Sequence, residues 1–268
     1  VFRRRQRQMC IRDSPYSPHI NAGAGGYFAP FIREYIRRYD APEHIGWKVA
    51  VKDRLNALKN PLAHLHIPGI DEKMVSDTPM LWEPLRYLES CPSSDGACAM
   101  VITSKDLVGS RDVAWIKGMA VRSEGTLSAG RDEVNPQAGI DCAKDIYDQA
   151  GITNPYKEID CAEIYVPFSW YEPMWLENLG FCDLGEGWKL TDKDATAIDG
   201  EMPFNMSGGV MSSNPIGASG MIRFGEAALQ VMGKANDHQV EDAKVAMGHA
   251  YGGAAQFFAM WIVSSSLD

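Results

Sequence analysis

The stretch Asn205-Met-Ser-Gly-Gly-Val-Met-Ser-Ser-Asn-Pro-Ile-Gly-Ala-Ser-Gly220 carries the most information about the fold. Gly208 and Gly209 allow positive φ angles and a close approach of the backbone. Asn214 followed by Pro215 is typical of a helix start, with Asn as the N-cap and proline at the first helical position. We therefore predict that a helix begins at Asn214 and turns its free N–H groups toward the glycine loop, as in sites for anions and developing oxyanions. On spacing alone, a plain helix cap after a glycine turn explains the same residues.

Two further segments place polar side chains beside predicted strands. Gly248-His-Ala-Tyr-Gly-Gly253 predicts a tight turn between two apolar strands, from which His249 and Tyr251 project. A histidine that titrates near neutral pH can serve as general acid or base, but a hydrogen-bonded structural histidine fits equally well. Ala162-Glu-Ile-Tyr-Val-Pro-Phe168 predicts a strand end, which is where α/β proteins place their ligands. Tyr165 is then either a site residue or a half-buried aromatic with a satisfied hydroxyl.

Composition limits the class of protein. The chain has 268 residues, of which 45% are hydrophobic and 23% charged, as in an ordinary globular protein. The longest apolar run, Phe257–Val263, is far shorter than the roughly 20 residues of a membrane-spanning helix, so we expect no membrane span. Six cysteines without a C-x-x-C pair predict neither a zinc ribbon nor a redox dithiol. We expect a reducing, cytoplasmic location.

The first 14 residues, VFRRRQRQMCIRDS, differ from the rest of the chain. They hold five Arg and one Asp, so without them the net charge falls from −9 to −13. Such an Arg run also fits a transit peptide or a nucleic-acid arm. We interpret it as a translated sequencing adapter, which implies that this chain is the later part of a longer protein. The acidic remainder makes nucleic acid an unexpected partner, because phosphate binding needs clustered Lys and Arg.

The rest of the chain alternates between predicted strands and helices, which indicates an α/β layered fold. Residues 105–112 are expected to connect two halves, 15–108 and 109–268. The predicted helices are Tyr27–Tyr39, His44–Lys59, Pro136–Ala150, Pro173–Gly180 and Ile216–Met232. The predicted strands are Ala97–Thr103, Val113–Val121, Cys161–Tyr165, Lys244–Met247 and Phe257–Ser264.

Several common site motifs are absent from the sequence. There is no G-x-x-x-x-G-K-[ST] or H-E-x-x-H, and no G-x-G-x-x-G beside a strand. His64 and His66 lie in a proline-rich loop without a Cys or carboxylate at metal-ligand spacing, so we interpret them as surface residues. We expect no metal and no bound cofactor.

Four separated motifs in a fixed order resemble one protein family. They are Val49-Ala-Val-Lys-Asp-Arg-Leu-Asn-Ala-Leu-Lys-Asn-Pro61, Pro79-Met80…Pro84-Leu85…Cys91-Pro-Ser-Ser-Asp-Gly-Ala97, Gly208-Gly209…Asn214-Pro215-x-Gly217-Ala-Ser-Gly220 and His249-x-x-Gly-Gly253. From Tyr27 onward the chain resembles the later two-thirds of a thiolase-superfamily protein. The subgroup is the sterol-carrier-protein-type or lipid-transfer thiolases, often labelled acetyl-CoA acetyltransferase.

The resemblance implies a five-layered αβαβα fold, with the C-terminal half complete and the N-terminal half partial. It also implies a homodimer and an acyl-CoA substrate, with coenzyme A as substrate or product, and it allows a small zinc-ribbon/OB-fold acyl-CoA-binding partner. The acyl-accepting cysteine of such enzymes lies upstream, and none of the six cysteines here matches it. The implied catalytic residues are His249, Asn214, Tyr165 and Tyr251. The implied substrate-binding residues are Ser207, Gly208, Gly209, Gly217, Ala218, Ser219, Gly252 and Gly253.

Two departures from the family pattern bear on the chemistry. Related thiolases carry Gly-His-Pro where this chain has Ser213-Asn214-Pro215, and Asn-Glu-x-Phe or His-Asp-Cys-Phe where it has Tyr165-Val-Pro-Phe168. Asn can donate to an oxyanion but cannot take a proton as histidine does. Tyr165 acts as an acid or base only if its pKa, about 10 when unperturbed, is lowered.

Three functions therefore stay open at the level of sequence. The family favours an acyltransferase that makes or breaks a carbon–carbon bond, with Asn214 in the oxyanion hole and His249 as acid/base. The missing histidines favour a thiolase-like aldolase that uses Tyr165, Tyr251 or His249 for retro-aldol cleavage of a β-hydroxy acyl-CoA. A non-catalytic subunit that binds acyl-CoA is the third.

The chain expressed as printed is expected to be poorly soluble, because strands that pair with its sheet would lie upstream and leave strand edges exposed. Size-exclusion chromatography and thermal unfolding check this expectation. A monodisperse protein with cooperative unfolding would contradict it.

Overall fold

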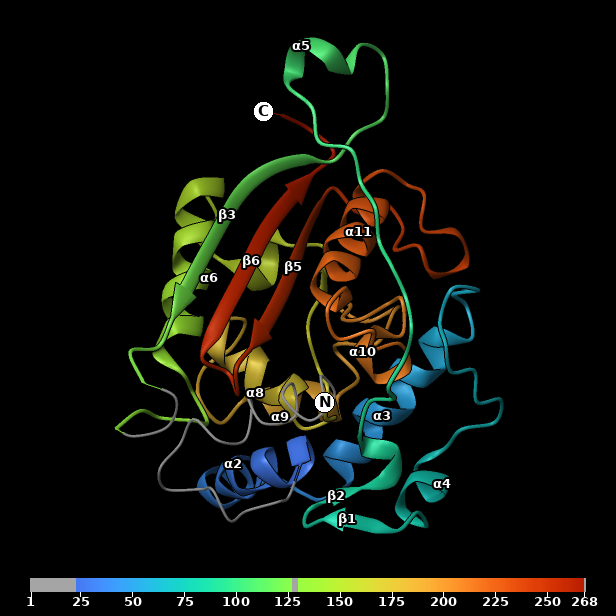
Figure 1. Ribbon diagram of the computed structural model, residues 1–268, viewed down its shortest axis with the longest axis vertical. Coiled ribbons are helices and arrows are strands. Elements are labelled where there is room, and N and C mark those ends of the chain that lie inside the picture. The colour runs from blue at the N-terminus through green and yellow to red at the C-terminus, as the bar shows by residue number, and fades with distance from the viewer. Residues whose placement is uncertain (1–22, 127–129, 268) are drawn as a thin grey trace, which may run out of the picture.

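A computed structural model describes residues 23–126 and 130–267, so the segment Val1–Ser14 lies outside the described residues. Its centre is a four-stranded mixed sheet in the order β3-β6-β5-β4 (Figure 1). The strands are β3 (Trp115–Ser123), β4 (Cys161–Glu163), β5 (Val245–Gly252) and β6 (Phe257–Ser264). β6 pairs antiparallel with β3 and β5, whereas β4 runs parallel to β5.

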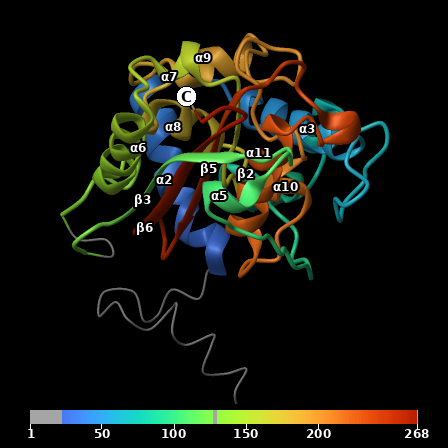
Figure 2. The same ribbon diagram turned by 90° about the horizontal axis from the view of Figure 1, so that it is seen from above.

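Helices cover both faces of this sheet, as the α/β prediction requires. α6 (Gln137–Ala150) packs on β3 and β6, and α11 (Ser219–Val231) packs on β5 and β4 from the other side (Figure 2). Both helices are amphipathic, with apolar residues at spacings of three and four. The mixed sheet between helices confirms the predicted α/β class.

The first part of the chain packs below the sheet in the view of Figure 1. α2 (Gly23–Tyr39) and α3 (His44–Ala57) confirm the two helices expected there. They are followed by short elements: α4 (Glu72–Ser76), β1 (Met80–Trp82), β2 (Leu85–Arg86), the 3-10 helix η1 (Tyr87–Glu89) and α5 (Lys105–Val108). Further short helices lie along the chain between β3 and β5: α7 (Pro155–Glu158), α8 (Tyr171–Asn178), α9 (Gly187–Asp192), α10 (Gly209–Ser212) and η2 (Asn236–His238).

The strand predicted over Ala97–Thr103 is wrong. No strand is assigned there, and Val101 and Ile102 are 95% and 72% exposed. The segment runs as an extended chain along α11 toward α5 (Figure 1), where Cys98 Sγ lies 3.6 Å from Met221 O. An apolar run forms a strand only if another strand pairs with its backbone, and none of the described strands reaches it.

Two boundaries near the predicted site also need correction. α11 begins at Ser219 rather than at Asn214, because the side chain of Asn214 bonds to other segments and does not cap the helix. β5 extends through Gly252, so His249 and Tyr251 lie within the strand and not in a turn. The turn follows them, between β5 and β6. The strand predicted over Cys161–Tyr165 ends at Glu163.

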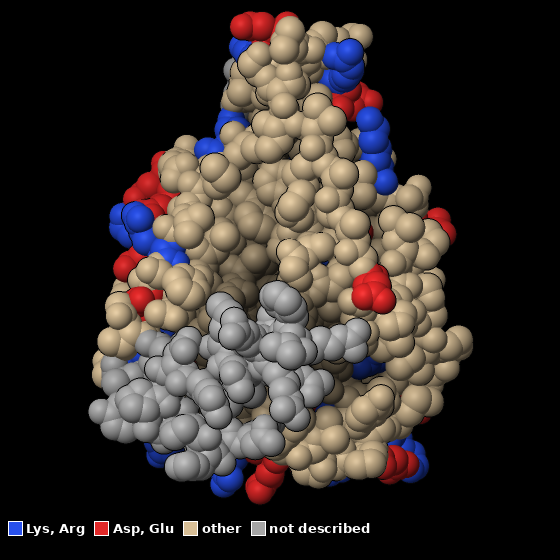
Figure 3. Space-filling model, viewed as in Figure 1, with Lys and Arg blue, Asp and Glu red and all other residues tan. Residues whose placement is uncertain are grey.

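One face of the molecule has few charged side chains at its centre. Lys, Arg, Asp and Glu gather around the edge of this face, and the central hollow, where Figure 1 shows β6, β5 and α11, carries few of them (Figure 3). Met119, Val121 and Phe257 are large exposed apolar residues of β3 and β6. Within residues 23–126 and 130–267, no helix is both long and apolar enough to cross a membrane.

The packing of α6 on β3 depends on Gly118. A Cβ at this position would lie 2.6 Å from the backbone oxygen of Ile146 in α6. Gly118→Ala is therefore expected to lower the free energy of unfolding by about 1–3 kcal/mol, the usual cost of overpacking. Urea denaturation measures the difference.

Gly217→Ala is the matched control, since an added Cβ there meets no atom within 4 Å. Its free energy of unfolding should change by less than about 0.5 kcal/mol. Equal stabilities of the two variants would contradict the close contact between α6 and β3.

Candidate active site

The side-chain amide of Asn214 is the centre of a hydrogen-bond cluster. Asn214 is 4% exposed, and its Oδ1 accepts from Tyr165 Oη at 3.1 Å and from Ser219 Oγ at 2.7 Å. Its Nδ2 donates to Cys91 Sγ at 3.1 Å. Asn214 and its three partners come from three separate segments of the chain. Three of these four residues are predicted site residues: Asn214, Tyr165 and Ser219.

Tyr165 and Tyr251 lie side by side at the strand ends. Their ring centroids are 5.2 Å apart in an edge-to-face arrangement, and Tyr165 O accepts from Trp175 Nε1 at 3.0 Å. Burial raises the pKa of Tyr165 to about 12 and that of Tyr251 well above its ordinary value. Both phenols are therefore neutral hydrogen-bond donors at neutral pH. The lowered pKa that the sequence analysis requires of Tyr165 as an ionised acid or base is not found, because burial disfavours the phenolate. Among the described residues, the buried Tyr251 Oη has no hydrogen-bond partner.

His249 lies in the core beneath these tyrosines. Its Nδ1 accepts from the backbone N–H of Tyr165 at 3.3 Å, and the rings of Trp175 and Phe258 lie 5.3 and 5.9 Å away. Burial among these rings lowers the pKa of His249 to about 3, so the imidazole is neutral at neutral pH. Of the two interpretations of His249, the hydrogen-bonded structural histidine fits this environment better, because burial disfavours the charged form. Its role in catalysis stays a prediction.

The glycine loop packs inside the protein. Gly208 has φ +89°, and a Cβ there would lie 2.6 Å from Ala57 Cβ in α3. Gly209, with φ +56°, is buried as well, and Ser207 bonds to charged groups of the core. These contacts give Ser207, Gly208 and Gly209 a structural role, and binding of substrate by them stays a prediction.

The remaining predicted binding residues lie at two places. Ser219 is part of the Asn214 cluster, while Gly217 is exposed and Ala218 half-buried in the turn before α11. Gly252 and Gly253 are exposed at the turn between β5 and β6.

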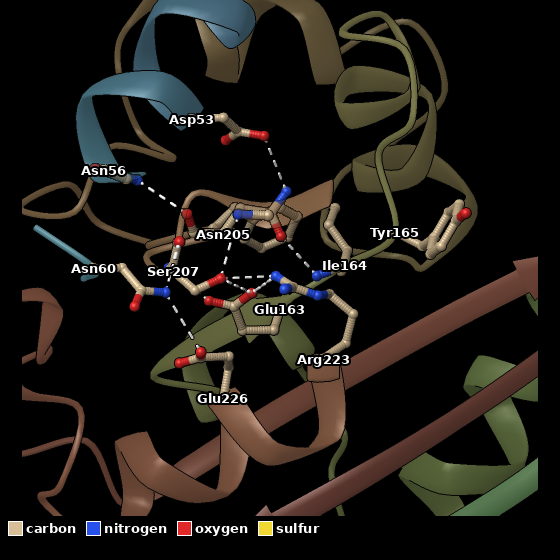
Figure 4. Close-up of polar contacts among 12 residues, drawn as sticks. Asp53, Asn56, Asn60, Glu163, Ile164, Tyr165, Asn205, Ser207, Arg223 and Glu226 are labelled. Carbon is tan, nitrogen blue, oxygen red and sulfur yellow. Dashed lines mark hydrogen bonds and ion pairs between the residues drawn. The ribbon is translucent and has the colours of Figure 1, made fainter. Parts of the chain in front are cut away.

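A buried charged cluster supports the site from below (Figure 4). Glu163 at the end of β4 forms an ion pair with Arg223 of α11, and both side chains are at most 2% exposed. Glu163 also accepts from Ser207 N and Ser207 Oγ, each at 2.9 Å. The side chain of Tyr165 points away from this cluster (Figure 4). The cluster therefore fixes β4, the glycine loop and α11 relative to one another without entering the site.

Asn205 connects the same strand to α3. It adopts φ +55°, and its Oδ1 accepts from Ile164 N at 2.8 Å while its Nδ2 donates to Asp53 Oδ2 at 3.4 Å. Its backbone oxygen accepts from Asn56 Nδ2 at 3.1 Å. Because Ile164 directly precedes Tyr165, these bonds fix the backbone of Tyr165 just after the end of β4.

Cys91 belongs to the Asn214 cluster although the sequence does not predict it as a site residue. No local pattern distinguishes it from the other cysteines, apart from its place at the start of the motif Cys91–Ala97. Ser94 of that motif accepts from Asn214 N at 3.0 Å. His64 is exposed, as predicted, yet its Nδ1 lies 2.8 Å from Ser94 Oγ, beside a cavity of about 310 Å³.

Comparison with known proteins identifies the family. The family described as "Thiolase C-terminal domain-like" matches residues 120–265, more than half of the chain. The chain belongs to the thiolase superfamily. It is 31% identical over 242 residues to an acetyl-CoA acetyltransferase of Methanothermobacter thermautotrophicus, with 88% of this chain and 62% of that protein covered. Sterol carrier protein 2 of Oryctolagus cuniculus is 29% identical over 253 residues, with 90% and 44% covered.

A solved structure described as "Ltp2-ChsH2(DUF35) aldolase" has the same fold. Its TM-score is 0.79 at 25% identity, with 90% of this chain and 63% of that chain covered. These findings confirm the thiolase fold and the resemblance to sterol-carrier-protein-type thiolases. This thiolase-superfamily chain spans between about four-tenths and two-thirds of the length of these three proteins.

Glu89 holds the Cys91 segment in place. Its carboxylate accepts from Arg86 N at 2.9 Å and from Ser169 Oγ at 3.1 Å, and burial raises its pKa from 4.5 to about 7. Between these two values the folded protein binds more protons than the unfolded chain, so stability falls as pH rises. We expect the free energy of unfolding to drop by on the order of 3 kcal/mol from pH 4.5 to 7 through Glu89.

Glu89→Gln should flatten that part of the pH dependence, because glutamine does not ionise. Urea denaturation at a series of pH values measures the slope. Glu241→Gln removes an exposed carboxylate and serves as the control with the same charge change. If Glu89→Gln and Glu241→Gln give the same slope, the burial cost assigned to Glu89 is wrong.

Proposed function

We propose that the full-length protein binds an acyl-CoA thioester at Asn214 and cleaves the carbon–carbon bond of a β-hydroxy acyl-CoA by a retro-aldol reaction. The observation that carries this proposal is the bond from Tyr165 Oη to Asn214 Oδ1, with Tyr251 beside it. These groups are neutral donors, which suits stabilisation of an enolate oxygen by hydrogen bonds. Coenzyme A enters as part of the substrate, and no other cofactor is proposed.

The reaction moves one proton from oxygen to carbon. The β-hydroxyl loses its proton to one phenol oxygen as the bond between Cα and Cβ breaks, which leaves a ketone or aldehyde. In the same step this phenol passes its own proton to the other phenol. The electron pair passes to the thioester enolate, whose oxygen accepts from Asn214 Nδ2. The other phenol delivers its proton to Cα, and the shorter acyl-CoA forms. Both phenols are therefore neutral again at the end of the reaction. Because burial raises the pKa of Tyr165 to about 12, its phenol acts as a proton relay, which accepts a proton only as its own proton leaves.

An acyltransferase is the second candidate, because relatives such as the acetyl-CoA acetyltransferase carry that name. That chemistry needs a thiolate nucleophile and a group that moves a proton near neutral pH. Asn214 cannot take a proton, and burial lowers the pKa of His249 to about 3. These two facts make the aldolase the better fit to the described residues.

The assembly of the protein is proposed by analogy. The neighbouring aldolase is described together with a DUF35 protein. We extend this to a small zinc-ribbon/OB-fold partner that binds acyl-CoA, and to a homodimer in the cytoplasm. The third reading, a subunit that binds acyl-CoA without turnover, stays an outcome of the experiment below.

The test is incubation of the full-length protein with a β-hydroxy acyl-CoA and no free coenzyme A, with detection of the ketone or aldehyde product. Tyr165→Phe should lower kcat by about 100-fold or more, because it removes a proton-transfer group. Asn214→Ala should lower kcat by about 100- to 1000-fold, as loss of an oxyanion donor does. Tyr156→Phe is the control, since its hydroxyl bonds to the distant Glu201 and its loss should leave kcat unchanged.

Other outcomes identify the other functions. A product that requires free coenzyme A, together with an acyl group on an upstream cysteine, would establish the acyltransferase. Binding of acyl-CoA without either product would establish the non-catalytic subunit. Full activity of Tyr165→Phe would contradict the role given to that phenol.

A further inference from the structure

The segment that carries Cys91 is fixed from several sides. Arg54 is 1% exposed, and its Nη2 donates to Leu88 O at 3.0 Å and to Ser90 O at 3.1 Å. The backbone N–H of Cys91 donates to Pro167 O at 2.9 Å. The backbone therefore sets the position of the Cys91 thiol within the site.

The same segment is bonded to the backbone of Asn214. Asn214 N donates to Ser94 Oγ at 3.0 Å, and Ser94 N donates to Asn214 O at 3.3 Å. The distance between the Cys91 thiol and the Asn214 amide is thus held by bonds at both residues. Because both backbones are held, the contact between Cys91 Sγ and Asn214 Nδ2 can influence how the Asn214 amide is oriented.

The hydrogen bonds of Asn214 select one of two orientations of its amide. Oδ1 accepts from two hydroxyls, those of Tyr165 and Ser219, and Nδ2 donates to the sulfur of Cys91. Rotation by 180° would turn both N–H bonds of Nδ2 toward the hydroxyl oxygens, which can also accept. In the observed orientation the contact with Cys91 uses one N–H of Nδ2, and the second N–H has no partner among the described residues.

We infer that Cys91 is a positioning residue, which orients the Asn214 amide so that Nδ2 presents its second N–H to the carbonyl oxygen of a bound thioester. This inference rests on the proposed function for the identity of the ligand. The sulfur acts as a hydrogen-bond acceptor and takes no acyl group. Its partner is an amide, which cannot remove the proton of the thiol, and burial raises the pKa of that thiol above its ordinary value.

The contact itself is tested without turnover, by the pH dependence of alkylation of Cys91 with iodoacetamide in the full-length protein, followed by peptide mass spectrometry. A donated hydrogen bond favours the thiolate. Asn214→Ala should therefore raise the apparent pKa of Cys91 alkylation by roughly half to one unit. Cys98, which bonds to Met221 O and not to Asn214, is the internal control and should keep its apparent pKa. An unchanged pKa at Cys91 would overturn the inference.

The orienting role is tested by substitution of the thiol. Cys91→Ala should lower kcat about 10-fold with little change in KM, because the N–H is needed most in the transition state. Cys91→Ser should recover most of that loss, since a hydroxyl accepts the same bond. Cys98→Ala should leave kcat unchanged. Equal kcat for Cys91→Ala and the parent protein would overturn the inference even if the alkylation pKa shifts.

Failure of the proposed function gives a different pattern. If the parent protein binds acyl-CoA without turnover, the variants are compared by their Kd for acyl-CoA. Cys91→Ala should then bind acyl-CoA most weakly, and Cys91→Ser should bind it nearly as well as the parent. If the parent neither turns over nor binds acyl-CoA, the proposed function fails and the ligand assigned to the Nδ2 N–H is overturned with it. In that case the alkylation experiment tests only whether Cys91 and Asn214 are in contact.

Discussion

The ion pair between Glu163 and Arg223 is the interaction on which the arrangement of the site depends. It joins the end of β4 to α11, and Ser207 adds the glycine loop through bonds to both charges. Isolated charges at this depth would cost several kcal/mol each, so neither side chain can be buried without the other. The geometry of Tyr165 above β4 and of Asn214 before α11 follows from this pairing.

Burial also decides what kind of chemistry the site can support. The pKa of Tyr165 rises to about 12 and that of His249 falls to about 3, so both groups are neutral over the physiological range. A cluster of neutral donors and acceptors stabilises developing charge by preorganised hydrogen bonds and not by ionised side chains. The aldolase proposed above depends on such neutral groups, whereas the acyltransferase needs a group that moves a proton near neutral pH.

The relation to the thiolases is shown at the level of the fold. The family match covers most of the sheet and the helices on its two faces, and Asn214 and Tyr165 lie within the matched residues. Function follows from the groups at a site and not from the fold that carries them. The Asn214 cluster, with Cys91 as one of its four members, is the part of the molecule to which the proposed function assigns the chemistry.

The sequence by itself determined most of the elements and the α/β class, because hydrophobic periodicity is local. The 3.6-residue period of α2, α6 and α11 and the apolar run of β6 need no knowledge of the rest of the chain. The motif around Asn214 also marks a segment whose side chains form a buried hydrogen-bond cluster. It gave the wrong helix start, because an Asn before a proline is a capping signal only if its side chain is free to cap.

Only the tertiary structure decided which groups meet and how they titrate. Cys91 and Asn214 are separated by 123 positions in the sequence, and no local pattern reports their hydrogen bond. The pKa of His249 depends on the rings of Trp175 and Phe258, which come from other elements. The run Ala97–Thr103 lacks a strand because pairing requires a neighbouring backbone, which lies beyond what a sequence segment encodes. Contacts and burial are properties of the whole fold, and they set the chemistry of this site.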